Sequence, residues 1–489
     1  MLFNSYAFVF FFLPLTLFLY FGCNYKNQYQ LGKIILLIAS FVFYGYGNYK
    51  LCALIGVSIL FNYLIHVLIV LCKQSCVWEK VFVATGILAN TALIGYYKYF
   101  DFVFHNLDRI FKFGFVEKNI LLPLGISFYT FQQISFLVDS MGADKKKVDF
   151  LDYALYISFF PQLVAGPITL HGEMVPQFND VTKKQLCWNN ILDGIEYFIL
   201  GLAKKMLIAD YFARLCDAGF ARIGELNTIS ALITMVAFTL EIYFDFSGYC
   251  DIAIGVGCMF NISIPINFYS PYKALSIGEF WKRWHKTLTR FLTTYVYIPL
   301  GGSRVNICRT CLNIFIVFLV SGIWHGAGWT FILWGVLHGI AMILYRISGK
   351  MWDRLPGMVR WLATFAFVNV AWIFFRAEHM KQALQFVGRF VWWGDGTVHQ
   401  EIVTSFYERT ILDELIGGMN MSVDAFVMGS LCVVLWTCFW IFVCKCSPSS
   451  HEMVVKKNKS NRYYVLLGIV VSCCIILMSG TSKFIYFNF

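Results

Sequence analysis

The sequence predicts an all-α polytopic integral membrane protein, on the basis of its low charge, its many aromatic residues and its repeated apolar runs. Of its 489 residues, 59% are apolar, 19% aromatic and only 14% charged, and the mean hydropathy is +0.65. Soluble globular chains carry about 25% charged residues, whereas aromatic residues gather at the two interfaces of a membrane. The composition therefore excludes a set of soluble domains, a disordered chain, a coiled coil and a disulfide scaffold.

Twelve apolar runs of nearly spanning length follow one another along the chain. A spanning helix needs about 20 mostly apolar residues. The first run lacks the basic start and the cleavage site of a signal peptide, so we expect it to be a retained helix. The expected helices are 6–23, 31–47, 51–72, 77–97, 120–138, 150–170, 186–208, 229–264, 310–345, 358–375, 423–444 and 463–480.

Two of these runs, 229–264 and 310–345, are too long for one crossing. Residues 310–345 include no Asp, Glu, Lys or Arg, and a straight helix of that length would reach about 54 Å across a core about 30 Å thick. That run must bend, break or re-enter, and Gly322, Gly326 and Gly328 mark the expected place. With such breaks counted, we expect about 11 to 13 membrane-embedded helices.

Charge patterning predicts the topology of the C-terminal part. Residues 346–360 and 445–462 are rich in Lys and Arg, whereas 395–424 carries six acidic residues and one arginine. Because cytoplasmic loops carry the excess of basic residues, we expect the two basic segments inside and the acidic segment outside, together with the C-terminus. The N-terminal half shows no such alternation, so its orientation stays open.

The net charge of +11 and the sixteen cysteines fit a membrane protein. The basic residues lie in short clusters between apolar runs, as topology signals do, which argues against a nucleic-acid groove. Most cysteines lie in apolar runs, where a thiol behaves as a small hydrophobe. Cys308 and Cys311 form a lone CxxC without a second pair, so we interpret them as free thiols, and no histidine spacing predicts a metal site.

The most informative stretch is 265–329. Between Lys273 and Arg309 it holds seven basic residues and one acid, Glu279, interleaved with aromatic residues. One interpretation is a cytoplasmic interfacial helix, basic on one face and aromatic on the other. A second interpretation, compatible with the first, is that the same helix gathers the phosphates of an anionic cofactor.

His325 is the candidate general base. It lies mid-way along the uncharged run, between Trp324 and Gly326. A polar side chain is costly within a bilayer and usually lines an interior cavity, and a neutral imidazole with a pKa near 6.5 can take a proton from a hydroxyl. The alternative is a satisfied structural histidine. By themselves, His285 is consistent with an interfacial residue and His338 with helix packing.

Glu241, Asp245 and Asp251 form a second candidate cluster, in a segment without Lys or Arg. The favoured interpretation is a helix end in the interface with solvated acids. The alternative is an internal cavity in which the acids pair with Lys204 or Lys205. Because two carboxylates on one helix face suit a proton or cation path, a transporter stays possible.

Several motifs together resemble the membrane-bound O-acyltransferase (MBOAT) superfamily, and within it the bacterial branch of alginate and peptidoglycan O-acetyltransferase membrane subunits. They are PLGISFYTFQQISFLVD (123–139), FFPQLVAGPI (159–168), FDFSGYCDIAIGVGCMF (244–260) and the 265–329 stretch. The likeness covers nearly the whole chain. It implies one transmembrane domain over 1–489, with a motif core at about 120–345, C-terminal helices at 358–489, and a ring of tilted helices around a tunnel.

The resemblance also implies roles for particular residues. His325, in WHG, would be the catalytic histidine, and His285, in RWH, a second histidine near the tunnel that could stabilise the oxyanion. Asn267, in PINFYSPY, matches another recurrent family position. Together with the basic stretch, this makes the candidate substrate-binding residues Asn267, Lys282, Arg283, Trp284 and Trp324.

The implied reaction moves an acetyl group from cytoplasmic acetyl-CoA to an extracytoplasmic polysaccharide, an alginate-like exopolysaccharide or peptidoglycan. The implied setting is a bacterial inner membrane, in contact with lipid, with a periplasmic acetyltransferase or esterase-fold partner and no bound cofactor. Two alternatives remain. A transporter would use Glu241, Asp245 and Asp251, and a non-catalytic scaffold would make His325 dispensable.

Overall fold

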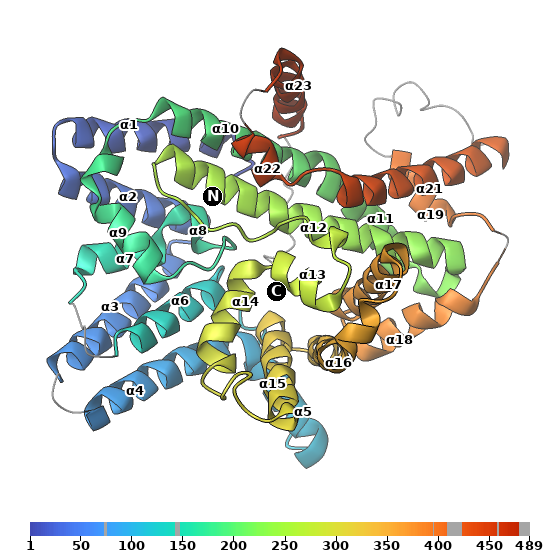
Figure 1. The fold of residues 1–489 in the computed structure, drawn as a ribbon, viewed down its shortest axis with the longest axis horizontal. Helices are drawn as coiled ribbons and strands as arrows, with labels where there is room; N and C mark the ends of the chain where they lie inside the picture. Colours follow the sequence, from blue (N-terminus) through green and yellow to red (C-terminus); the bar gives the residue numbers. More distant parts are fainter. Residues whose placement is uncertain (73–75, 142–146, 395, 408–422, 457–458, 479–489) are drawn as a thin grey trace. The chain divides into compact units, whose positions relative to one another are not determined.

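The computed structural model describes residues 1–72, 76–141, 147–394, 396–407, 423–456 and 459–478, and every regular element in these ranges is a helix (Figure 1). This confirms the all-α prediction. In the described ranges, eight helices are long and apolar enough to cross a membrane, and α2 (Tyr29–Gly45) and α23 (Asn461–Leu477) are shorter apolar helices. The long ones are Phe8–Tyr25, Lys50–Leu71, Val77–Phe111, Thr228–Met259, Ile307–His325, Trp329–Trp352, Gly357–Arg376 and Phe426–Cys446.

The chain forms two compact units that interleave in sequence. The first comprises Met1–Leu202, Tyr249–Ile266 and the described residues from Val454 onward. The second comprises Ala203–Gly248 and Asn267–Met453. The predicted site residues Asn267, His285 and His325 all belong to the second unit.

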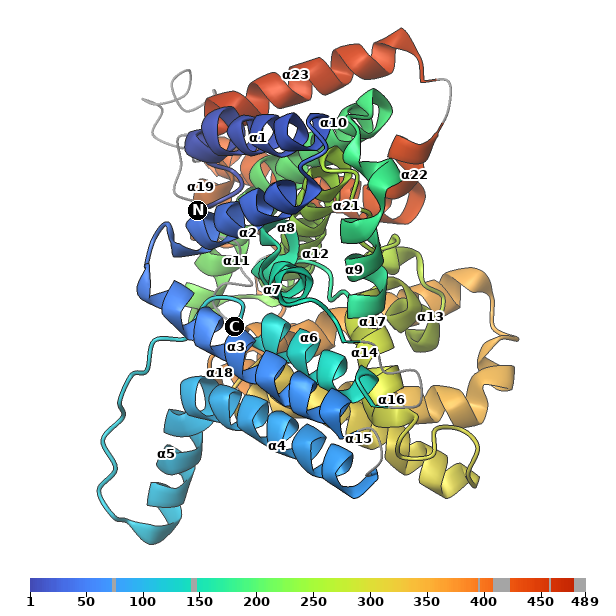
Figure 2. The ribbon, with the colours of Figure 1, turned by 90° about the vertical axis from the view of Figure 1, so that its left-hand side faces the viewer.

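In the first unit, α3, α4 and α6 lie side by side (Figure 2). Two predicted spans, 120–138 and 150–170, form helices shorter than the roughly 20 residues a crossing needs. The helix predicted over 186–208 begins at Trp188 and continues through a π-helical turn, Lys204–Ala209, into α11 (Asp210–Ala221). Gly125 helps to explain the late start of α6: its φ is +74°, and a Cβ there would lie 2.7 Å from the Leu163 carbonyl oxygen. The helices of this unit are α1 (Leu13–Tyr25), α2, α3 (Lys50–Leu71), α4 (Cys76–Ile94), α5 (Phe100–Phe111), α6 (Ile126–Asp139), α7 (Phe150–Ser158), α8 (Phe160–Leu163), α9 (His171–Asn179), α10 (Trp188–Ala203) and α23.

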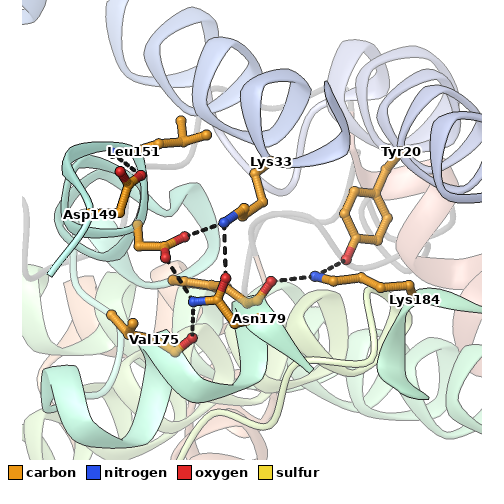
Figure 3. A network of polar contacts seen from close by, with 9 residues as sticks. Tyr20, Lys33, Asp149, Leu151, Val175, Asn179 and Lys184 are labelled. Atoms are coloured by element: carbon orange, nitrogen blue, oxygen red, sulfur yellow. Dashed lines mark hydrogen bonds and ion pairs between the residues drawn. The ribbon is translucent and has the colours of Figure 1, made fainter. Parts of the chain in front are cut away.

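A buried polar network holds α2, α7 and α9 together (Figure 3). Lys33 Nζ lies 2.6 Å from Asp152 Oδ1 and donates to Asn179 Oδ1 at 3.0 Å. The Asn179 amide donates in turn to Asp152 Oδ2 at 2.7 Å. The ion pair is almost fully buried, so removing one partner would leave an uncompensated charge. The sequence does not predict this clamp, because Lys33 lies within an apolar run.

The second unit holds the paired helices α15 and α16, which pack closely. The expected break in 310–345 is confirmed, because α15 ends at His325 and α16 begins at Trp329. Close approach depends on Gly322: a Cβ there would lie 2.5 Å from the Phe331 carbonyl oxygen. The unit contains α11 (Asp210–Ala221), most of α12 (Thr228–Met259), α13 (Ile277–Arg283), α14 (Lys286–Leu292), α15 (Ile307–His325), α16 (Trp329–Trp352), α17 (Gly357–Arg376), α18 (Met380–Gly388), α19 (Gln400–Tyr407), α21 (Val423–Cys446) and nearly all of α22 (Ser450–Val455).

Two predictions about local structure are wrong. The run 229–264 is not broken: α12 continues through 32 residues to Met259. Residues 273–309 are not one interfacial helix, because α13 and α14 are separate and a π-helical turn, Thr293–Tyr297, follows. The reason is His285, whose left-handed backbone (φ +43°) interrupts the helix.

The topology prediction for the acidic segment 395–424 depends largely on residues outside the described ranges, namely 395 and 408–422. The orientation of the basic segments 346–360 and 445–462 therefore stays a prediction.

Candidate active site

His325 lies in an aromatic enclosure at the end of α15. Its side chain is buried, and the extended Gly326 backbone follows it. The ring centroid of His325 lies 5.1 Å from those of Trp334 and Phe375, and 4.8 Å from that of Trp324. These neighbours belong to α15, α16 and α17, so the break between α15 and α16 places an imidazole inside the helix packing.

His285 lies beside His325. Their ring centroids are 6.4 Å apart, and the ring centroid of Phe246 lies 4.9 Å from that of His285 in a T-shaped contact. His285 is fully buried, unlike the interfacial residue that its position in a basic stretch suggests. Its left-handed backbone is uncommon for a residue with a side chain and costs about 1–3 kcal/mol, a kind of strain that is typical of functional sites.

Asn267 anchors His285 from a buried position. Its Oδ1 lies 3.1 Å from His285 Nδ1 and accepts from the Thr287 amide at 3.2 Å and the Thr287 hydroxyl at 2.9 Å. The Lys286 amide donates to the Asn267 carbonyl oxygen at 2.9 Å. Asn267 therefore contacts three consecutive residues around the helix break.

The second imidazole nitrogen of His285 is available for chemistry. Nε2 is buried and has no hydrogen-bond partner among the described residues. Burial lowers the pKa of His285 to about 3, so the ring is neutral at physiological pH. Asn267 contacts only the Nδ1 side of the ring.

The two candidate tryptophans have different surroundings. Trp324 packs against both imidazole rings, with its ring centroid 6.1 Å from that of His285. Trp284 is a buried core residue, with ring centroids 4.9 Å from Phe268 and 5.0 Å from Trp372. The structure brings Trp324 into the site and gives Trp284 a packing role.

A cavity of about 610 Å³ lies among α13, α14, α15, α16 and the first turn of α17. Its lining includes Ser321, which precedes His325 by one helical turn on α15, and the aromatic side chains of Trp281 and Phe318. Its charged lining residues are Lys282, Arg346, Arg360, Glu279 and Asp353. The cavity thus extends from cationic side chains to Ser321, one helical turn before the buried His325.

Lys282 and Arg283 differ in whether their charged groups are free to bind a ligand in the cavity. Lys282 lines the cavity. Arg283 pairs with Glu279, at 2.9 Å from Nε to Oε1, and donates to the Tyr269 carbonyl oxygen at 3.1 Å. Arg283 is therefore committed to the local fold. In the sequence, Arg346 and Arg360 are topology signals alone, and only the fold brings them into the lining of the same cavity as Lys282.

The carboxylates of α12 are buried, so the prediction of solvated acids at a helix end is wrong. Asp245 Oδ1 lies 2.6 Å from Lys205 Nζ, which also lies 2.8 Å from Asp210. The alternative pairing is thus confirmed for Lys205. Burial alone would lower the pKa of Lys205, but the charges of Asp245 and Asp210 outweigh it and raise the pKa above its usual value. Glu241 is buried one turn away, and its Oε2 has no partner among the described residues.

His338 packs as expected. Its Nδ1 accepts a hydrogen bond from the Trp281 indole at 3.3 Å, inside a cluster of aromatic rings. Among the described side chains, no group of three His, Cys, Asp or Glu residues could hold a metal ion. Fifteen of the sixteen cysteines are free thiols.

A multi-pass helical membrane protein with two adjoining buried histidines and a cation-lined cavity has the features of an enzyme that carries out group transfer within the membrane. Comparison with known proteins identifies the family. The chain matches the family described as MBOAT, membrane-bound O-acyltransferase family, over residues 41–378, and it belongs to that family. The protein is therefore an O-acyltransferase, as the sequence motifs indicated.

Two relatives resemble the chain over most of its length, and a third resembles about half of it. It is 39% identical over 524 aligned positions to a peptidoglycan O-acetyltransferase of Helicobacter pylori, covering 100% of this chain and 98% of that protein. It is 38% identical over 391 positions to the probable alginate O-acetylase AlgI of Pseudomonas aeruginosa, covering 78% and 73%. A teichoic acid D-alanyltransferase of Bacillus subtilis is 26% identical over 262 positions, covering 51% and 66%.

Proposed function

We propose that the protein moves an acetyl group from cytoplasmic acetyl-CoA to an extracytoplasmic glycan, with peptidoglycan as the first candidate acceptor. The observation that carries this proposal is the cation-lined cavity, which reaches to within one helical turn of the buried His285–His325 pair. The similarity over the whole chain to a peptidoglycan O-acetyltransferase supports that acceptor, and the similarity to the alginate O-acetylase makes an exopolysaccharide the second candidate.

The cavity suits a thioester of coenzyme A. Lys282 and Arg346 supply cationic groups for the phosphates of the donor. Arg360, which pairs with Asp353 at 3.2 Å, adds a third cationic group to the lining. Apolar lining residues, including Trp281 and Phe318, suit the less polar pantetheine arm. A donor bound in this way would direct its acyl carbon toward the histidines while its charged end stays in water.

The chemistry needs one proton acceptor. A sugar hydroxyl is a poor nucleophile until a base removes its proton, and a neutral imidazole is the usual side chain for that task. We assign the centre of the reaction to His325, with His285 completing a pair beside it. The aromatic enclosure excludes water, which protects the thioester from hydrolysis.

The proposed setting is a bacterial inner membrane. The donor side is the cytoplasmic side, in keeping with the basic loop 346–360. The acetyl group passes to the glycan directly or through a periplasmic acetyltransferase or esterase-fold partner.

The test is complementation of a strain from which the gene has been deleted. Mild base releases ester-bound acetate from isolated peptidoglycan and, separately, from exopolysaccharide. We expect acetate to be missing from the peptidoglycan of the deletion strain and restored by the wild-type gene. Loss confined to exopolysaccharide would transfer the assignment to that acceptor, and unchanged acetate in both polymers would refute the proposal.

A further inference from the structure

We propose that the α5 arm, defined as residues 100–121, lies in the headgroup layer of the membrane and binds anionic phospholipid there. The arm comprises α5 and the irregular segment that follows it (Figure 2). The inference goes beyond the proposed function and does not depend on it, because no residue of the donor cavity or of the histidine pair belongs to the arm.

The length and charge pattern of the helical stretch Val77–Phe111 indicate that α5 lies at a membrane boundary. This stretch has 35 residues and would reach about 52 Å if straight, whereas the hydrocarbon core is about 30 Å thick. Residues 81–97 include no Asp, Glu, Lys or Arg and span about 26 Å. That segment therefore crosses most of the core, and α5, with two aspartates and an arginine, begins where the core ends.

A π-helical turn, Gly95–Tyr99, separates α5 from α4. π-bulges are among the usual causes of a sharp change in helix direction. Figures 1 and 2 both show α5 turned away from the direction of α4, and no residue of α5 is buried. The side chains of α5 therefore meet an environment outside the packing of the first unit.

One face of α5 is apolar and exposed. Residues three, four and seven positions apart share a helix face, and at this spacing α5 carries only apolar side chains on one side. Ile110 and Phe111 on this face are 71% and 69% exposed. Such a face is typical of an amphipathic helix that lies in the plane of a membrane interface. The exposed members of the face are Val103, Phe104, Leu107, Ile110 and Phe111.

The segment after α5 folds back on the helix and fixes the shape of the arm. Asp101 Oδ1 accepts a hydrogen bond from the Lys118 amide at 3.0 Å, and Asp108 Oδ1 accepts one from the Gly114 amide at 2.7 Å. The ring of Phe115 stacks on that of Phe104, with the centroids 5.5 Å apart. The arm thus holds one shape through its own contacts and presents its apolar face outward.

The unpaired charges of the arm are basic, which favours anionic phospholipid as the group that it meets. The two aspartates accept the backbone amides described above, and Glu117 lies 3.2 Å from His105 Nδ1. Arg109 and Lys112 are exposed and form no ion pair with any described residue. Basic residues on the polar face of an interfacial helix attract anionic headgroups.

The experiment measures the membrane depth of two positions of α5 with a bimane label on the full-length protein. In a background without the sixteen native cysteines, Ile110→Cys carries the label on the apolar face, and Arg109→Cys, the matched control, carries it on the polar face. Both side chains are exposed, so neither change removes a packing contact. The proteins are reconstituted in vesicles of phosphatidylcholine and phosphatidylglycerol in equal amounts.

Three quenchers are compared: a nitroxide lipid labelled near the headgroup, one labelled near the end of the acyl chain, and aqueous iodide. We expect the shallow nitroxide to quench the label at Ile110→Cys about twofold more strongly than the label at Arg109→Cys, and iodide to show the reverse order. Equal quenching of the two labels by iodide would place the arm in water and overturn the inference. Strongest quenching of the Ile110→Cys label by the deep nitroxide would place the arm in the hydrocarbon core and overturn it as well.

The lipid charge is tested by leaving out phosphatidylglycerol, which should weaken the shallow quenching of the Ile110→Cys label because the basic residues then lack anionic partners. Unchanged quenching would exclude binding of anionic phospholipid. Adding Arg109→Gln and Lys112→Asn to the labelled protein should have the same effect as leaving out this lipid, and asparagine tolerates the left-handed backbone of position 112. Adding Lys80→Gln, which removes an exposed charge at the other end of the stretch, should change nothing, and an equal effect would overturn the inference.

A protein that covers the apolar face of α5 would give a different result in native membranes. There the Ile110→Cys label would be protected from iodide and also from added shallow nitroxide lipid. We expect the nitroxide lipid to quench it as in the vesicles, and protection from both quenchers would overturn the inference.

Discussion

His285 and His325 stand far apart in the sequence, yet their rings lie 6.4 Å apart, each at an interruption of a helix. Both interruptions have a physical cause. The left-handed backbone of His285 separates α13 from α14, and the extended Gly326 ends α15 directly after His325. At the scale of single residues, the site is thus built from positions where helical hydrogen bonding stops and buried polar groups need other partners.

Substitution of Lys205 tests whether this lysine compensates the buried charge of Asp245. Lys205→Met leaves Asp245 buried without its cation, which typically costs about 3–5 kcal/mol. We expect a marked drop in melting temperature and in yield. Lys204→Met is the control, because Lys204 lies over the Tyr243 ring at 5.9 Å, a contact worth about 0.5–2 kcal/mol.

The double variant Lys205→Met/Asp245→Leu distinguishes a structural role of this ion pair from a role in ion transport. Replacing a buried ion pair by apolar groups is often neutral for stability. We expect the double variant to fold and to acetylate glycan at a near-normal rate. A folded double variant without activity would make the pair part of the mechanism and revive an ion-coupled role for α12.

At the scale of elements, α13 provides side chains with two different tasks. Lys282 faces the cavity, whereas Arg283 is held by Glu279 and Tyr269. Arg346 of α16 and Arg360 of α17 complete the cationic lining. The proposed donor site would be assembled from three helices, which explains why a contiguous basic stretch is a poor guide to its members.

Substitution of these arginines and lysines separates donor binding from folding. For Lys282→Gln, Arg346→Gln and Arg360→Gln, we expect the KM for acetyl-CoA to rise about 5-fold, which corresponds to ~1 kcal/mol, with kcat nearly unchanged. The effect should be larger at low salt, because salt screens such charges. Arg283→Gln should leave the KM of the folded protein unchanged. An increased KM for Arg283→Gln alone would contradict the cavity assignment.

The sequence predicted most of what depends on local pattern. Hydropathy identified the helical membrane class, and glycine spacing located the break beside His325. Contacts between residues far apart in the sequence could not be predicted in this way. Three of them join residues from different elements: the Lys33–Asp152 clamp, the cavity lining by Arg346 and Arg360, and the Asn267–His285 hydrogen bond. The burial of the α12 acids was mispredicted because Lys205, from another element, neutralises Asp245 inside the packing, whereas a hydropathy pattern shows only an acid that looks exposed.

At the scale of the whole molecule, the proposed function requires a donor on one side of the membrane and an acceptor on the other. The segment 346–360 carries the basic excess expected of a cytoplasmic loop, and α17 leads from it toward the acidic segment. With its 20 residues, α17 is long enough for one crossing. The two segments are therefore expected on opposite sides.

Cysteine labelling tests this topology. In a background without the sixteen native cysteines, Thr404→Cys should react with an impermeant maleimide in intact spheroplasts. Arg354→Cys should react only after permeabilisation. Both positions are exposed in the structure. The reverse pattern would overturn the topology and, with it, the cytoplasmic position of the donor cavity.

The most direct test of the central claim is the acetyl content of glycan in cells that express His325→Ala. Loss of general-base assistance typically lowers a rate about 10²- to 10⁴-fold, so we predict no detectable ester-bound acetate although the protein is inserted and folded. His66→Ala is the control, since it removes a buried histidine that bonds to the Ser140 hydroxyl at 2.8 Å, and it should retain acetylation if it folds. Wild-type acetate in cells with well-expressed His325→Ala would contradict the catalytic assignment and favour a scaffold or a transporter.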